Sequence, residues 1–160
     1  MQDEDLKPGG PPKAVRIRLP DIRKSLTHKF TIQMGTGELD GYLTVSFYDD
    51  GSPGEIFIRV AKIGSTEQGL LDNLALAVSI ALQHGVPLDV FVEKFIHQKF
   101  EPSGMTMNEE IPFAKSLPDY IFQWLGQKFC NLPVRHPTEA LCLPLADESA
   151  DRNFLPDETR

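Results

Sequence analysis

The chain has 160 residues and a formal net charge of −7, with 41% hydrophobic and 24% charged residues. This composition is ordinary for a soluble globular domain and excludes collagen, coiled-coil and wholly disordered chains. The net negative charge also disfavours non-specific binding to nucleic acid, because a phosphate backbone attracts a basic surface.

The chain opens with a predicted flexible leader, residues 1–14, in which Lys, Gly and Pro dominate and little apolar surface can be buried. Beyond it, apolar and polar residues alternate with the period of two that is typical of half-buried strands. Turn-forming residues separate the alternating runs, and the short connections predict antiparallel pairing. The predicted strands cover residues 15–19, 28–34, 42–48 and 55–60.

The hydrophobic period changes from that of a strand to that of a helix at Ser65. Ser65 and Gln68 have the spacing of a capping box, and apolar residues then recur at helical spacing as far as Leu82. Gly85 supplies a C-terminal stop. The sequence therefore predicts a first helix between these signals.

Two shorter helices are predicted to follow. Pro87 can occupy the first turn of a helix that reaches about residue 100, and a third helix opens at residues 116–119. Residues 15–128 are thus predicted to form a single α+β domain, an antiparallel sheet of about four strands followed by two to three helices packed on one face. Prolines recur in residues 129–160, which are predicted to be an irregular or disordered acidic tail.

A candidate anion or nucleotide site lies where the last predicted strand leads into the first helix. Free backbone N–H groups and the positive end of the helix dipole favour an anion at such a place. An alternative stays open, in which Ser65 only caps the helix and Gly64 only relieves a tight turn. The candidate residues are Arg59, Lys62, Gly64, Ser65 and Thr66.

The third predicted helix carries Tyr120, Phe122 and Trp124 on more than one face, because residues two apart point in different directions. These side chains either complete the core or form a partner surface, where Tyr and Trp are enriched. His28 occupies an apolar position of a predicted strand, and we interpret it as a packing or surface residue rather than a ligand.

Cys130 and Cys142 are too few for a disulfide framework and belong to no C-x-x-C element. Their spacing with His136 differs from that of structural zinc sites, so no metal site is predicted. A redox role, by exchange with a disulfide elsewhere, is the alternative for the two thiols. No nucleophile elbow or metalloprotease motif occurs, and no self-contained active site is predicted. No apolar run reaches the roughly 18 residues of a membrane span, and the acidic N terminus is unlike a signal peptide, so we expect a cytoplasmic protein.

Six short segments occur in a fixed order between residues 15 and 125. They are SLTHKF (25–30), GEIFIR (54–59), GST (64–66), VEKF (92–95), FEPSG (100–104) and AKSLPDYIFQWL (114–125). In this order and spacing they resemble the TSCPD domain found near the carboxyl end of adenosylcobalamin-dependent, or class II, ribonucleotide reductases.

The resemblance implies an accessory subunit or stand-alone homologue of that C-terminal module, which supports deoxyribonucleotide synthesis by binding the catalytic chain or nucleotides. The catalytic barrel of the family lies outside these residues, so we expect no reduction by this chain alone, and adenosylcobalamin is expected in the partner enzyme. Two alternatives stay open: an independent nucleotide- or phosphate-binding regulatory domain, and a thiol-relay protein that uses Cys130 and Cys142. A homo-oligomer is a further expectation.

Overall fold

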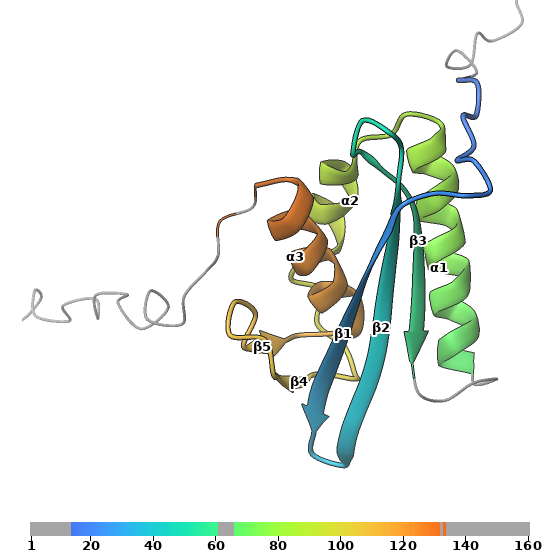
Figure 1. Ribbon diagram of the computed structural model, residues 1–160. Coiled ribbons are helices and arrows are strands. Elements are labelled where there is room, and N and C mark those ends of the chain that lie inside the picture. The colour runs from blue at the N-terminus through green and yellow to red at the C-terminus, as the bar shows by residue number, and fades with distance from the viewer. Residues whose placement is uncertain (1–13, 61–65, 132, 134–160) are drawn as a thin grey trace, which may run out of the picture.

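The computed structural model describes residues 14–60, 66–131 and 133, and these form five strands and three helices (Figure 1). The strands follow the order β3-β2-β1-β4-β5, and each neighbouring pair is antiparallel. This architecture confirms the predicted α+β class. The elements are β1 (Ser25–Met34), β2 (Gly37–Phe47), β3 (Pro53–Val60), α1 (Thr66–Gln83), α2 (Leu88–Phe95), β4 (Gly104–Thr106), β5 (Phe113–Ala114) and α3 (Leu117–Phe129).

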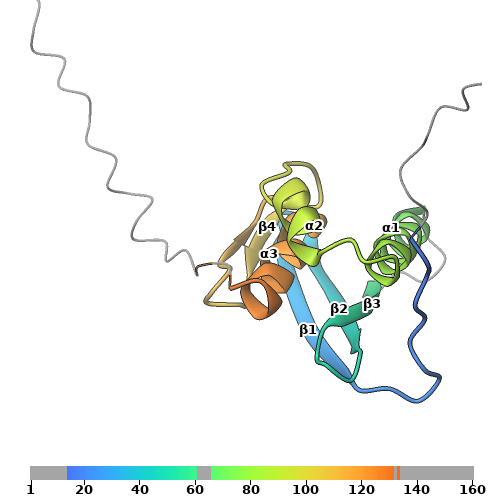
Figure 2. The same ribbon diagram turned by 90° about the horizontal axis from the view of Figure 1, so that it is seen from above.

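The three long strands bury alternate side chains, as the period of two predicts. All three helices lie on the same side of the sheet, with α1 near β3 and α3 near β1 (Figure 2). The side chains that the sheet turns toward the helices are almost fully buried, whereas the opposite face carries polar and half-exposed aromatic residues. The central buried residues of the sheet are Phe30, Ile32, Leu43, Val45, Ile56 and Ile58.

Helix α1 begins and ends close to its predicted bounds. Leu71, Ala75, Val78 and Leu82 form its buried stripe. The helix stops before Gly85, whose φ of +84° is the left-handed conformation that glycine adopts most readily after a helix.

Polar side chains of α1 also hydrogen-bond the outer edge of β3. The hydroxyl of Ser79 accepts from the backbone N–H of Ile56 at 2.9 Å, and the amide of Gln83 donates to the carbonyl of Gly54 at 3.0 Å. At the other end of the strand, Gln68 donates to the carbonyl of Ile58 at 2.9 Å and accepts from the N–H of Val60 at 2.8 Å. Because α1 satisfies these backbone groups, β3 does not offer an open sheet edge.

Helix α3 is fixed at its N terminus by Ser116 and Asp119, both fully buried. The Ser116 hydroxyl accepts from the backbone N–H of Asp119 at 3.2 Å and donates to the carbonyl of Gln98 at 2.8 Å. The Asp119 carboxylate accepts from the N–H groups of His97, at 2.5 Å, and Lys115, at 2.9 Å. These bonds tie the start of α3 to the segment that leaves α2.

The predicted strand at residues 15–19 is wrong. This segment joins no strand of the sheet and instead runs beside the end of α1, where the N–H of Ile17 donates to the carbonyl of Gln83 at 2.8 Å. Val15 and Ile17 are 84% and 66% exposed, so the alternation of residue types does not correspond to burial. A neighbour for this segment in the sheet is lacking because α1 already covers the edge of β3.

The structure also differs from the predicted elements at the end of α2 and in two short strands, and tertiary contacts cause both differences. The second helix stops at Phe95 rather than near residue 100, because Ile96 is extended and His97 has a φ of +68°. Strands β4 and β5 lie in a stretch that the sequence predicts as a loop, since runs of three and two residues carry no readable period.

The predicted leader, apart from Ala14, and the predicted tail, apart from residues 129–131 and 133, lie outside the described residues. No helix in the described part of the chain combines the length and the apolar character needed to cross a membrane.

Candidate functional site

Strand β1 has an open edge over most of its length. It pairs with β2 from Ser25 to Met34 but with β4 only at Ile32 and Gln33. The carbonyl of Lys24, an even-numbered residue, accepts from the N–H of Phe47 in β2. Because an antiparallel ladder alternates, the odd-numbered residues of β1 turn their N–H and C=O groups toward the open edge.

Those outward backbone groups belong to Thr27, Lys29 and Thr31. Within the described ranges, no hydrogen bond reaches them from outside the strand. Unpaired strand edges readily accept another extended segment, because each outward N–H and C=O can join a new ladder. The geometry of this edge is therefore that of a docking site for a strand.

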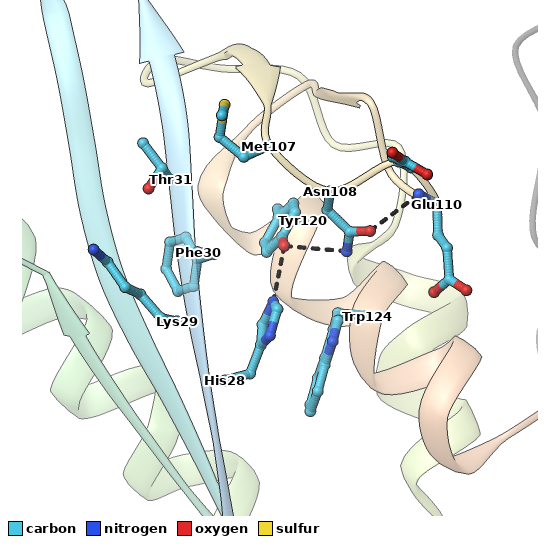
Figure 3. Close-up of a pocket in the computed structure, with 10 residues that line it drawn as sticks. His28, Lys29, Phe30, Thr31, Met107, Asn108, Glu110, Tyr120 and Trp124 are labelled. Carbon is cyan, nitrogen blue, oxygen red and sulfur yellow. Dashed lines mark hydrogen bonds between the residues drawn. The ribbon is translucent and has the colours of Figure 1, made fainter.

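A cleft of about 610 Å³ lies beside this edge (Figure 3). Its walls are β1, the loop 107–110 and the first two turns of α3. Lys29 lies on the β1 side, and the carboxylates of Glu109 and Glu110 lie on the loop side, so the rim carries charges of both signs.

His28, Tyr120 and Trp124 form what we call the aromatic wall of the cleft. The rings of His28 and Trp124 are stacked, with centroids 4.6 Å apart and an interplanar angle of 10°. Nε2 of His28 lies 2.9 Å from the hydroxyl of Tyr120. Tyr120 itself is buried against Phe30, at 5.1 Å between ring centroids. The wall is therefore anchored in the core, and only its Trp124 and His28 rings are partly exposed.

Asn108 links the hydroxyl of Tyr120 to the backbone of the loop 107–110. Nδ2 of Asn108 donates to the hydroxyl oxygen of Tyr120 at 3.3 Å, and Oδ1 of Asn108 accepts from the N–H of Glu110 at 3.0 Å. The Tyr120 hydroxyl therefore contacts both Asn108 and His28, and it joins the loop, α3 and β1.

The ionisation of His28 is expected to make stability depend on pH. Burial lowers the pKa of His28 from its ordinary value of 6.5. The unfolded chain therefore binds more protons than the folded chain just below that value, and the free energy of unfolding should fall modestly from about pH 7 to about pH 5. Urea unfolding at several pH values measures this slope. His28→Phe keeps a ring beside Trp124 and should make the free energy of unfolding depend less steeply on pH. An unchanged pH dependence would contradict a lowered pKa of His28 in the folded chain.

Only part of the predicted anion site can be placed. Arg59 and Thr66 are described, whereas Lys62, Gly64 and Ser65 lie outside the described residues. The guanidinium of Arg59 lies 3.5 Å from the carboxylate of Asp72, which already supplies an anionic neighbour. Thr66 is the first residue of α1. The site as a whole stays a prediction.

The predicted partner surface of Tyr120, Phe122 and Trp124 needs a correction. Tyr120 and Phe122 are 1% and 0% exposed, and Phe122 stacks on Phe95 at 4.7 Å between centroids. The alternative in which the aromatic residues of α3 complete the core therefore describes these two side chains. Of the three, Trp124 alone is accessible, through the cleft.

Cys130 lies half-buried just after α3, and Cys142 lies outside the described residues. Burial, with a smaller contribution from the negative charge of Asp89, raises the pKa of the Cys130 thiol. A raised pKa lowers the thiolate fraction, which is the reactive form in disulfide exchange. The redox prediction stays untested. Among residues 14–60 and 66–131, no group of three His, Cys, Asp or Glu side chains could hold a metal ion.

The sequence does not single out the cleft. His28 is placed correctly as a packing residue, but its stacking on Trp124 and its bond to Tyr120 join positions far apart in the chain. Asn108 lies in a loop without any recognisable motif. The one local signal is the alternation of β1 itself, which is the same for an edge strand and a central strand.

Within the described residues, the open part of the β1 edge and the aromatic cleft beside it are features of the kind that bind an extended peptide segment. The chain belongs to the TSCPD domain family, because the family model matches residues 12–129. No solved structure matches the chain.

Curated relatives carry the name vitamin B12-dependent ribonucleotide reductase. The chain is 56% identical to the protein from Rhodopirellula baltica over 119 residues, which are 74% of this chain and 11% of that protein. It is 42% identical to the protein from Streptomyces avermitilis over 123 residues, 77% of this chain and 12% of that protein. The protein from Bradyrhizobium diazoefficiens is 41% identical over 129 residues, 78% of this chain and 10% of that protein. The chain thus spans about a tenth of the length of these relatives.

The cleft does not fit the adenosylcobalamin that these names imply. A volume of about 610 Å³ is in the range of pockets for drug-sized ligands, whereas a corrin with its nucleotide and adenosyl arms is much larger. His28 is the histidine in the cleft, and its Nε2 is already bonded to Tyr120. We therefore assign no role toward the cofactor to these residues.

Proposed function

We propose that the chain is an accessory subunit or stand-alone homologue of the C-terminal module of class II ribonucleotide reductase, and that it supports deoxyribonucleotide synthesis in the cytoplasm by binding the catalytic chain. The observation that carries the proposal is the identity of more than half of 119 aligned residues with a segment of one such reductase. In that relative the matching segment is part of the reductase chain. The catalytic chain, not this one, would bind adenosylcobalamin.

The open edge of β1 is the surface that we propose for this contact. An extended segment of the catalytic chain would pair with the outward backbone groups of Thr27, Lys29 and Thr31 and continue the sheet. Its side chains would then alternate into the cleft, where the partly exposed ring of Trp124 offers an apolar contact. Backbone pairing would supply affinity, and the aromatic wall would select the side chains.

A proline placed at the open edge is expected to separate binding from folding. The N–H of Lys29 points away from β2, so Lys29→Pro removes no ladder bond to β2 and is of the kind that edge strands tolerate. We expect Lys29→Pro to weaken binding to the catalytic chain by about tenfold or more, because one new ladder bond is lost and the ring obstructs the added strand. Lys29→Ala, the matched control, should bind within about threefold of the unmodified chain. Calorimetric titration with the catalytic chain measures both.

Failure of the unmodified chain to bind the catalytic chain would reject the proposal. Equal binding by Lys29→Pro and Lys29→Ala, with both folded, would reject the open edge while keeping the partner. Titration with nucleoside di- and triphosphates in the same instrument tests the regulatory-domain alternative at Arg59 and Thr66. A heat of binding with nucleotides but none with the catalytic chain would favour that alternative. The thiol-relay alternative would instead require that serine at both Cys130 and Cys142 stops turnover that depends on thioredoxin.

A further inference from the structure

The cleft beside β1 carries two carboxylates on its loop side. Glu109 and Glu110 are adjacent in the loop 107–110, and both are exposed. Within the described residues, neither carboxylate takes part in an ion pair. Figure 3 shows the Glu110 carboxylate on the far side of the Trp124 ring from His28. The loop side of the cleft is therefore negatively charged.

The two basic residues that line the cleft do not offset this charge. The ammonium of Lys29 lies 3.9 Å from the carboxylate of Asp40 on β2, and Figure 3 shows it turned away from Trp124. Burial lowers the pKa of His28, so its ring is neutral at pH 7. A cation would therefore be attracted to the cleft, whereas the phosphate of a nucleotide would be repelled.

The indole of Trp124 is a second feature that favours a cation. His28 is stacked on one face of the indole, and Phe129 meets it at 79° with 6.0 Å between ring centroids. The indole still lines the cleft and is partly exposed. An indole attracts a cation within about 6 Å of its centroid, more often arginine than lysine. A guanidinium can stack on the ring and also donate two N–H groups to a carboxylate.

A strand added to β1 would aim alternate side chains at these groups. Residues that lie next to each other on adjacent strands point to the same side of a sheet. His28 and Phe30 point from β1 toward the helices and line the cleft. The side chains of an added strand that lie beside them would therefore enter the cleft as well.

We propose that the cleft is a subsite for an arginine side chain of the added segment, with its guanidinium between the ring of Trp124 and the carboxylate of Glu110. This inference rests on the proposed function, in which a segment of the catalytic chain extends the sheet at β1. Backbone pairing alone does not distinguish one sequence from another. The subsite would determine which segment binds and in which register it pairs.

The selectivity for arginine is expected to be modest, because both contacts are made close to solvent. Exposed cation–π contacts and exposed ion pairs are each weak. Together they should lower the dissociation constant of an arginine peptide by about three- to tenfold, relative to a peptide with an uncharged side chain of the same shape.

The fluorescence of Trp124 measures this selectivity, because Trp124 is the single tryptophan of the chain. The probe is the acetylated and amidated peptide Val-Thr-Arg-Thr-Val, and its control carries citrulline, an uncharged isostere, in place of arginine. Titration of the full chain should change the emission with both peptides, with tighter binding of the arginine peptide.

Glu110→Gln should remove most of the difference between the two peptides. Glu93→Gln is the matched control, because it removes an exposed carboxylate on α2 that does not line the cleft. It should keep the difference. Circular dichroism checks that both variants fold.

Equal dissociation constants for the two peptides, or unchanged emission with both, would overturn the subsite. Arginine selectivity that survives both Glu109→Gln and Glu110→Gln would overturn it as well. A response to nucleoside triphosphates but not to the arginine peptide would assign the cleft to nucleotides instead. Arginine selectivity in a chain that does not bind the catalytic chain would reject the proposed partner and keep the subsite.

Discussion

Replacing Asp119 with alanine is expected to reduce the free energy of unfolding by about 3 to 5 kcal/mol, because two backbone N–H groups lose a charged acceptor. These donors belong to His97 and Lys115, and the Asp119 side chain is fully buried between them. The free energy of unfolding of a small domain is only about 5 to 15 kcal/mol in total. The variant should therefore be close to unfolded at ambient temperature.

Urea unfolding followed by circular dichroism measures this loss. Asp119→Asn should lie between alanine and the unmodified chain, since the amide keeps one acceptor oxygen but turns an NH2 group toward the other N–H donor. Asp89→Ala is the matched control, because Asp89 is an exposed carboxylate in the first turn of α2. Removing this carboxylate should lower the free energy of unfolding by about 1 kcal/mol or less, because a negative charge in the first turn interacts favourably with the helix dipole. If Asp119→Ala and Asp89→Ala lowered the free energy of unfolding by similar amounts, the hydrogen bonds of the Asp119 carboxylate would be unimportant for stability.

The second large effect is expected at Ser79, where alanine should cost about 1 to 3 kcal/mol of unfolding free energy. The Ser79 hydroxyl is the acceptor for the N–H of Ile56 on the outer edge of β3, and it is 3% exposed. Alanine leaves that buried donor unpaired and uncovers part of a strand edge. Because open edges recruit other strands, the variant should also aggregate at lower temperature than the unmodified chain.

Thermal unfolding with light scattering, together with urea unfolding, measures both consequences. Ser52→Ala serves as control, since Ser52 is exposed in the turn between β2 and β3 and its hydroxyl bonds only the neighbouring Asp50 side chain. That change should stay within about 0.5 kcal/mol. If Ser79→Ala were as stable as Ser52→Ala, water or a shift of α1 would have to satisfy the Ile56 N–H. The protection of the outer edge of β3 would then not depend on the Ser79 side chain.

Local signals predict the elements that are long and periodic. The alternation of β1, β2 and β3 and the capping and stop signals around α1 describe real elements, and Ser116 is the cap of α3 as its position suggests. The same alternation at Val15 and Ile17 is misleading, because burial requires a neighbour and α1 already covers the adjacent edge.

Long-range pairing decides the rest, and a local pattern does not contain it. Strand β4 is held close to β1 at Gly104, where an added Cβ would lie 2.0 Å from the carbonyl oxygen of Gln33. Where β4 stops pairing determines how much of β1 stays open, and so where the cleft lies. His28 and Trp124 face each other only as a result of that arrangement.

The bonds from α1 to β3 also determine how the domain can open locally. In most edge strands, half of the amides exchange hydrogen with water after brief fraying, whereas the N–H groups of Ile56 and Val60 are held by side chains of one helix. Their exchange requires α1 to move away from the sheet. The strand and the helix therefore act as one cooperative unit, even though they share no backbone ladder.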